Sequence, residues 1–201
     1  MVAPHIADEV KPRPVFGIPV TLDVFDRAFA GSSQQLQTFG TLPSSELSVE
    51  LHSAAEWLDV PTEDILLAAL GRTFGRTRGE GAVAVDVTGG HRWLTHPVSL
   101  LCAASLPMGP TELLQGAHSA LAAAPGHPAP QSEVLLNVTD RAAADASGGY
   151  ALELRARVAD GALHLDWWYD PARLDDYSVQ EMAEQFPLAL IEITSDAAAP
   201  L

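Results

Sequence analysis

Apolar and polar residues alternate most regularly in the C-terminal third of the chain. Apolar side chains occupy every second position over residues 150–158 and again over residues 163–169. A period of two is typical of strands that bury one face. Asp160-Gly161 lies between the two runs, and this pair readily adopts the positive φ angles of a two-residue turn. The pattern predicts a β-hairpin with one apolar and one polar face.

A three-to-four spacing of apolar residues predicts helices in the middle of the chain. Residues 47–58 place their apolar side chains on one helical face. Thr62 then caps a very apolar helix that extends through Phe74, and glycines at 79–81 end it. A short helix is expected near residues 111–121.

The last helix is expected to begin at Ser178-Val-Gln-Glu181. This sequence is a capping box, in which the serine and glutamate side chains satisfy free backbone amides. Apolar residues recur at helical spacing from Val179 to Leu190, so one face of the helix should pack on a sheet. Pro187 lies inside this run and should kink or shorten the helix, because proline lacks an amide hydrogen.

Three further segments are apolar almost throughout, which is typical of buried central strands. They are residues 82–87, 98–106 and 134–138. The fold class that follows is α+β, a two-layer sandwich with helices packed on a mixed β-sheet. We expect an N-terminal extension at residues 1–35, a single domain at 36–193 and a flexible tail at 194–201.

Composition narrows the classes of partner. The chain has 201 residues, 47% of them hydrophobic, with 11 Lys and Arg against 26 Asp and Glu, a net charge of −15. That length and apolar content support a folded core. A surface this negative repels phosphate groups, so neither nucleic acid nor an anionic membrane is expected as a partner. No apolar stretch is long enough to span a bilayer.

Cys102 is the single cysteine, so the chain can form neither an internal disulfide nor a thiolate metal cluster. Its place in an apolar segment predicts a buried, inert thiol with a high pKa. No export signal is visible, and a reducing cytoplasm suits this cysteine usage. No phosphate-binding loop or dinucleotide fingerprint occurs, so no cofactor is expected.

Two stretches carry a family resemblance. One is the hairpin that ends in Trp167-Trp168-Tyr169-Asp170 before its capped helix, and the other is the apolar segment from Val60 to Leu70. With the order of elements over residues 36–193, they resemble the C-terminal lobe of nonribosomal peptide synthetase condensation and epimerization domains. The resemblance implies a chloramphenicol-acetyltransferase-like fold. In that family two lobes form a V, and carrier-bound acyl or aminoacyl groups meet in a tunnel between them.

The sequence departs from that family at the groups that move protons. The family's HHxxxDG motif belongs to the N-terminal lobe, and this chain has no adjacent pair of histidines. A glutamate of epimerization domains would match Thr88, whose hydroxyl is too weak a base for that task. A tyrosine of the family would match Val138. We therefore expect that this chain alone performs neither condensation nor epimerization by the family mechanism.

A different catalytic site is conceivable around the segment that follows Thr88. His91, Arg92 and His96 lie close together in sequence, and Asp170 follows the hairpin. These four residues are the candidate catalytic set. No metal site is expected, because two histidines five residues apart on a strand would face opposite sides.

The tryptophans offer candidate contacts for a partner. Trp167 and Tyr169 share the inward strand face and should belong to the core, whereas Trp168 points outward. Trp168 and Trp93 are therefore the candidate partner-binding residues.

Two hypotheses of function follow. In the first, the chain is a stand-alone lobe in nonribosomal peptide or hybrid peptide–polyketide synthesis, a binding or scaffold subunit. It would pair with a synthetase or carrier-protein component, with a complementary N-lobe or with itself, through an uncovered apolar patch. In the second, it is an autonomous small enzyme that transforms a pathway intermediate at His91, Arg92, His96 or Asp170.

Overall fold

A computed structural model describes most of the chain: residues 20–28, 35–89, 92–93, 97–105, 108–123, 132–139 and 149–201. For Arg92 and Trp93 it describes the backbone only. Strands and helices follow one another in this order: β1 (Gln37–Gly40), α1 (Ser45–Leu58), α2 (Thr62–Arg78), β2 (Gly81–Gly89), β3 (Arg92–Trp93), β4 (Val98–Cys102), α3 (Pro110–Ala122), β5 (Val134–Val138), β6 (Leu152–Ala159), β7 (Ala162–Tyr169) and α4 (Asp176–Asp196).

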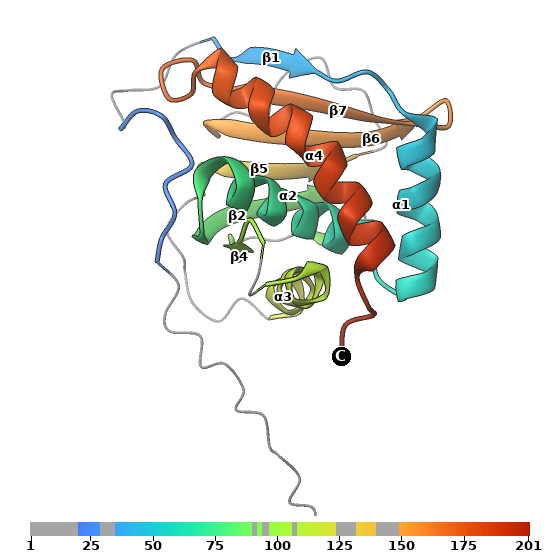
Figure 1. Cartoon of the computed structure of the whole chain (residues 1–201). Helices are drawn as coiled ribbons and strands as arrows, with labels where there is room; N and C mark the ends of the chain where they lie inside the picture. Colours follow the sequence, from blue (N-terminus) through green and yellow to red (C-terminus); the bar gives the residue numbers. More distant parts are fainter. Residues whose placement is uncertain are drawn as a thin grey trace, which may run out of the picture.

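The strands form one mixed sheet. Six of its seven described strands run in the order β1-β7-β6-β5-β2-β3, and the seventh, β4, pairs with β2. Figure 1 shows this path from β1 to β2. The β2–β5 and β5–β6 pairs are parallel, and the other pairs are antiparallel. The predicted mixed sheet is confirmed.

The predicted hairpin is also confirmed. β6 pairs with β7 along their whole length, from Leu152 opposite Tyr169 to Ala159 opposite Ala162. Asp160 and Gly161 form the turn with φ angles of 53° and 73°. Both values are positive, as the two-residue turn that matches strand twist requires.

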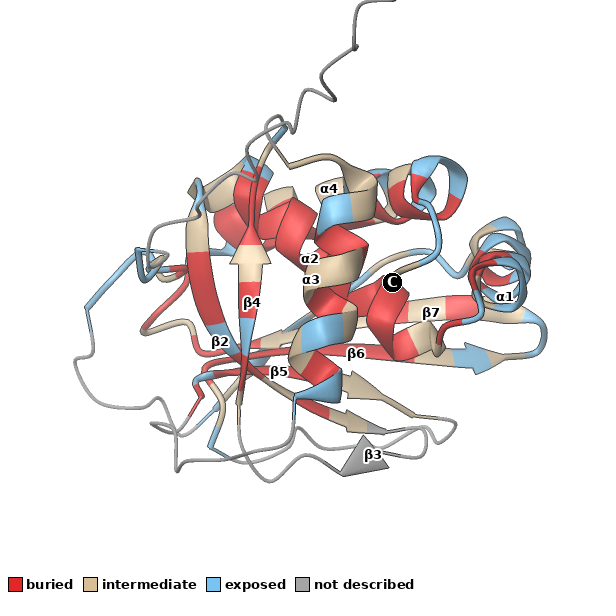
Figure 2. Cartoon of the chain, turned by 90° about the horizontal axis from the view of Figure 1, so that it is seen from below, coloured by how far each residue is buried: buried red, intermediate tan, exposed pale blue. Residues whose placement is uncertain are grey.

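All four described helices lie on one side of the sheet (Figure 2). The core fills the space between these two layers and contains the inward side chains of β2, β5, β6 and β7. Trp167 at its centre is fully buried and meets the Phe186 ring of α4 edge to face, with ring centroids 5.9 Å apart. The α+β, two-layer expectation is confirmed. None of the described helices is long and apolar enough to cross a bilayer.

Two helix starts differ from the predictions. Pro61 is the N-cap of α2, and Thr62 is already the first helical residue, so the predicted Thr62 cap is wrong. Asp175 is the N-cap of α4, which places Ser178 inside the first turn. The predicted capping box is therefore wrong as well, because the Ser178 hydroxyl donates to Asp26 instead of to the helix backbone.

Two other helix features can be compared with the pattern. In α1 the face that includes Leu51 and Leu58 is buried, as the spacing predicts. Pro187 does not shorten α4, which runs unbroken through it to Asp196. An apolar face on both sides of the proline holds this helix against the core, and this offsets the hydrogen bond that proline removes.

β4 is not the central strand that its apolar run predicts. Among the described strands it pairs only with β2, and Ser99 is exposed. It ends at Cys102, opposite Gly81, where its partner strand β2 begins. Beyond this end, the buried Arg72 guanidinium of α2 donates to Ala103 O at 2.8 Å and to Met108 O at 3.0 Å, so these carbonyls are satisfied outside a strand ladder.

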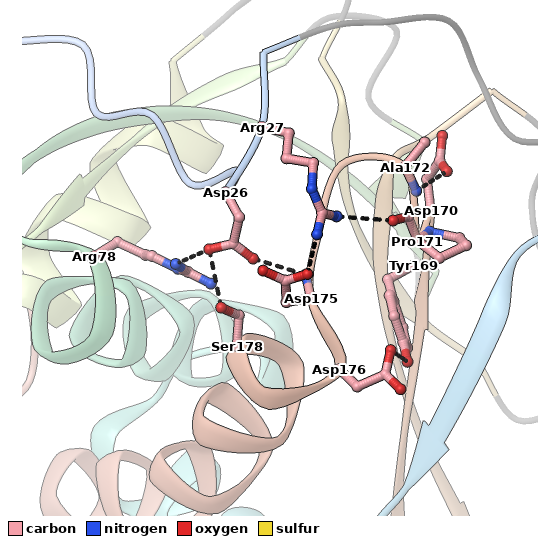
Figure 3. Close-up of polar contacts among 10 residues, drawn as sticks. All are labelled: Asp26, Arg27, Arg78, Tyr169, Asp170, Pro171, Ala172, Asp175, Asp176 and Ser178. Carbon is pink, nitrogen blue, oxygen red and sulfur yellow. Dashed lines mark hydrogen bonds and ion pairs between the residues drawn. The ribbon is translucent and has the colours of Figure 1, made fainter.

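Residues 20–28 pack against the domain. Thr21 forms a parallel bridge with Ala82 at the start of β2, and Val24 is buried in the core. The guanidinium of Arg173 lies 4.1 Å from the centroid of the Phe25 ring. Asp26 and Arg27 then bind the loop between β7 and α4 (Figure 3).

Asp26 caps α4 from this distant segment. Its carboxylate accepts hydrogen bonds from Asp175 N at 2.7 Å and Ser178 Oγ at 2.9 Å, and it pairs with Arg78 of α2 at 2.7 Å (Figure 3). Burial alone raises the pKa of the Asp26 carboxyl, but these donors outweigh burial and hold the pKa below its ordinary value of 3.8. Asp26 therefore takes over one half of the predicted capping box, because it accepts from the amide of the N-cap residue Asp175.

The C-terminal residues also contact the domain. Ala197 is buried, Ala198 N donates to Thr111 Oγ1 of α3 at 3.0 Å, and Leu201 N donates to Gln115 Oε1 at 2.7 Å. The division into an extension, a domain and a tail stays a prediction.

We predict that Asp26→Ala lowers the free energy of unfolding by about 1–2 kcal/mol at pH 7, because it removes a helix cap and an ion pair. Since folding lowers this pKa, the contribution is complete above pH 3.8 and is lost as the pH falls through the lowered value. Urea unfolding at several pH values measures the difference from the parent. Glu80→Ala, at an exposed carboxylate, is the control and should change little. A loss that persists unchanged at the lowest pH would contradict the assigned role.

Candidate functional site

On the side of the sheet away from the helices, neighbouring strands carry mostly polar residues in two adjacent lines. Strand register aligns Asp86, Leu135, Glu153 and Trp168 in one line across β2, β5, β6 and β7. A second line, two residues further along the same strands, consists of Thr88, Asn137, Arg155 and Asp166. We call the eight residues of these two lines the polar sheet face.

A buried ion pair lies at the centre of the polar sheet face. Glu153 and Arg155 are 1% and 3% exposed. Arg155 donates to Glu153 Oε1 through Nη2 at 2.9 Å and Nε at 3.1 Å, and Asn137 Nδ2 donates to the same oxygen at 2.9 Å. The Trp168 ring covers the guanidinium, 5.3 Å from its centre. Buried charges are tolerated only when they are paired in this way.

Tyr150 and Asp86 form a second polar contact beside this pair. The Tyr150 hydroxyl donates to Asp86 Oδ2 at 2.8 Å. Burial, this hydrogen bond and the negative charges of Asp86 and Glu153 raise the pKa of Tyr150 to about 12. The phenol therefore stays protonated at neutral pH and acts as a hydrogen-bond donor.

The two positions that the resemblance singled out lie at the same end of the sheet. Thr88 is opposite Asn137, and Val138 is opposite Gly89. Neither Thr88 nor Val138 can act as a base, and the carboxylate of Glu153 is engaged by Arg155 and Asn137. This arrangement suits hydrogen bonding and charge recognition better than proton transfer. Among the described residues, no three His, Cys, Asp or Glu side chains gather as a metal ion would require.

Most of the predicted catalytic set cannot be placed. His91 and His96 lie outside the described residues, as do the side chains of Arg92 and Trp93. The backbone of β3 sets Arg92 opposite Gly89 and Trp93 opposite Thr88, next to the polar sheet face. Their catalytic and partner-binding roles stay predictions.

Asp170 lies at the other end of the sheet, in the turn that follows β7 (Figure 3). Its Oδ1 accepts from Ala172 N at 2.8 Å, and its carbonyl accepts from Arg173 N and Leu174 N. Val85 and Tyr169 lie in one line across the sheet, and Asp170 is one residue beyond that line. Arg92 pairs with Gly89, which is four residues after Val85 on β2. Five residues along a strand and four strand spacings across amount to roughly 17 Å and 19 Å, so the backbones of Arg92 and Asp170 are far apart.

The orientation predicted for the tryptophans is confirmed. Trp167 and Tyr169 are buried on the side of the sheet that the helices cover. Trp168 points to the opposite side, where it is partly exposed and lies over Arg155. Its role in binding a partner stays a prediction. Cys102 is buried, and burial raises the pKa of its thiol to about 12, as expected of an inert cysteine.

The alternating pattern missed the Glu153–Arg155 pair, because it assigned polar residues of β6 to a solvated face. A usable signal was present: opposite charges two residues apart on a strand share one face, and Asn137 belongs to a neighbouring buried strand. The expected uncovered apolar patch is also not found here. The exposed large apolar side chains of the described residues lie elsewhere, and none belongs to the polar sheet face except the partly exposed Trp168.

We predict that Arg155→Met lowers the free energy of unfolding by about 3 kcal/mol or more, because it leaves a buried carboxylate without its cation. The double variant Glu153→Gln/Arg155→Met removes both charges and should recover most of that loss. Urea unfolding measures all three proteins. A single variant as stable as the parent would show that the pair is not buried in solution.

We predict that Asp86→Asn lowers the pKa of Tyr150 from about 12 part of the way toward 10, because the negative charge of Asp86 is removed while burial remains and the amide oxygen can still accept the hydrogen bond. Near-ultraviolet absorbance follows the titration. The background Tyr169→Phe/Tyr177→Phe leaves Tyr150 as the single tyrosine. An unchanged titration in Asp86→Asn would mean that the two side chains do not meet.

Known proteins resemble this chain in sequence and in fold. No family model matches the chain. One of the phenolphthiocerol/phthiocerol polyketide synthase subunits of Mycobacterium tuberculosis is 29% identical over 223 residues, and the protein of the same name from Mycobacterium bovis matches equally. The alignment covers 83% of this chain and 15% of that polyketide synthase protein, so the chain spans a small part of its curated relatives.

Solved structures match over nearly the whole chain. The epimerization domain from the third module of tyrocidine synthetase B gives a TM-score of 0.62 at 13% identity, over 90% of this chain and 52% of that one. The first condensation domain of the CDA synthetase gives 0.59 at 16% identity, over 91% and 49%. A condensation domain that mediates chain release from the enacyloxin polyketide synthase gives 0.52 at 18% identity, over 83% and 42%. The chain therefore has the chloramphenicol-acetyltransferase-like fold of about half of a condensation or epimerization domain.

Proposed function

We propose that the chain acts as the C-terminal lobe of a condensation-like domain in nonribosomal peptide or hybrid peptide–polyketide synthesis. In this role it supplies a binding surface and not a complete active site. The observation that carries the proposal is the match to about half of condensation and epimerization domains. The likeness to a polyketide synthase protein supports the biosynthetic setting.

We assign to the partner, a complementary N-terminal lobe or a second copy of this chain, the partly exposed residues of the polar sheet face: Asp86, Thr88, Asn137, Asp166 and Trp168. None of the described helices covers them, and the buried Glu153 and Arg155 hold Asn137 and Trp168 in fixed positions. Side chains that are ordered before binding lose little entropy on association. Partly exposed Trp168, at the β7 end of the line, adds an aromatic anchor.

The lack of the family's proton-transfer residues supports a binding role. The chain has no adjacent histidines, and the resemblance implies that Thr88 and Val138 stand where the family has its proton-transfer groups. An incoming thioester would therefore meet a wall of hydrogen-bonding groups on this lobe, and proton transfer would come from the partner. The partners within a synthase, including any carrier protein, belong to this proposal.

The pairing is tested by sedimentation velocity of the chain alone and mixed with the segment that precedes the matched region in the mycobacterial synthase. We expect a complex or a homodimer, weakened about ten-fold or more by Trp168→Ala. Tyr177→Ala, which truncates an exposed aromatic residue at the start of α4, is the matched control and should bind as the parent does. A chain that stays monomeric alone and in the mixture contradicts the proposal.

A second experiment separates binding from catalysis. Aminoacyl-pantetheine thioesters are incubated with the purified chain in deuterated water, and exchange at the α-carbon is followed by NMR. We expect no exchange above the uncatalysed rate. Exchange that disappears in His91→Ala/His96→Ala would overturn the binding role and establish the enzyme hypothesis, whereas loss in Glu153→Gln alone would place the base on the polar sheet face.

A further inference from the structure

The outer surface of α1 carries an unpartnered apolar row. The helix buries Ser48, Leu51, Ala54 and Leu58 against the rest of the domain. On the opposite side, Val49, Ser53 and Trp57 follow one another at intervals of four residues, so they form one ridge. Val49 is 63% exposed and Trp57 is 68% exposed. An exposed tryptophan of this extent is uncommon on a surface that contacts only water.

Acidic side chains line both sides of this row. At 100° per residue, Glu56 falls on one side of the row, and Glu46 and Glu50 fall on the other. All three carboxylates are exposed. The sequence contains no lysine or arginine between residues 28 and 71, and His52 is the basic residue of α1, exposed one turn before Glu56. The surface presents an apolar centre between two negative borders.

The spacing of the row suits another helix. Ser53 is small and lies between two large side chains, one helical turn from each. A large side chain of an opposing helix can enter the space above Ser53, as a ridge enters a groove in helix packing. From Val49 to Trp57 the row extends about 12 Å, which is two turns of helix.

We propose that this face, defined by Val49, Ser53 and Trp57 with their flanking glutamates, docks a basic amphipathic helix of a partner protein. Apolar residues of the partner lie against the row, and its lysines and arginines pair with Glu46, Glu50 and Glu56. Charge complementarity selects this occupant. A second copy would set acidic borders against each other, and an anionic membrane would be repelled.

The probe is a capped synthetic helix of about 18 leucines and lysines, with leucine at helical three-to-four spacing. Its binding to the full chain is measured by fluorescence anisotropy at low and high salt. We expect binding that weakens with salt and that falls about ten-fold or more in Trp57→Ala. The triple variant Glu46→Gln/Glu50→Gln/Glu56→Gln should bind about ten-fold more weakly as well. An acidic peptide in which glutamate replaces lysine should not bind.

Matched controls separate docking from general attraction to an acidic protein. Tyr177→Ala truncates an equally exposed aromatic residue, 75% exposed, at the start of α4. Glu80→Gln/Glu112→Gln/Glu184→Gln changes the net charge by the same amount as the triple variant on α1, at exposed positions on other parts of the surface. Both controls should bind the peptide as the parent does.

Three outcomes would overturn the proposal. The first is absence of peptide binding to the parent at low salt. The second is an equal loss in the control triple variant, which would mean attraction by net charge alone. The third is a dimer of the parent that Trp57→Ala converts to a monomer, because the occupant would then be a second copy. All substituted side chains are exposed, so circular dichroism and thermal unfolding should match the parent.

Discussion

The buried pair of Glu153 and Arg155 is the interaction on which the helix-free side of the sheet depends. The described helices all pack on the other side, where apolar side chains from four strands meet them. The strands are nevertheless buried on both faces at their centre, and the two charges there are paired with each other. Asn137 adds a hydrogen bond to Glu153 and the Trp168 ring a cation–π contact to Arg155, so four side chains from three strands hold one another in place.

This arrangement explains why the fold could be predicted from the sequence more fully than the site. Periodicity in β6 and β7, the Asp160-Gly161 turn and the apolar run of α2 are local signals, and each predicted the observed element. The errors arose where a distant residue intervened. Asp26 caps α4 in place of a local box, and Arg72 binds carbonyls beyond the end of β4. Neither contact leaves a trace in the pattern of neighbouring residues.

The same limit applies to the candidate site. Alternation alone marks Glu153 and Arg155 as polar, but it cannot say whether the polar side of a strand faces water or another layer. The register of β5 against β6 is what brings Asn137 to Glu153. The sequence pattern grouped Arg92 and Asp170 in one candidate set, whereas the parallel and antiparallel pairings separate them to opposite ends of the sheet. Topology, and not residue type, decides these distances.

The contact between Asp26 and the start of α4 has a consequence for how the chain folds. It joins residues that are about 150 positions apart, and the β2 bridge at Thr21 joins the same early segment to the sheet. Contacts of such high contact order form late, because a long loop must close before they contribute. The first turn of α4 therefore acquires its hydrogen bonds to Asp26 only after the sheet has formed. During synthesis, α4 lacks its contact with Asp26 until the ribosome has released the C-terminal residues.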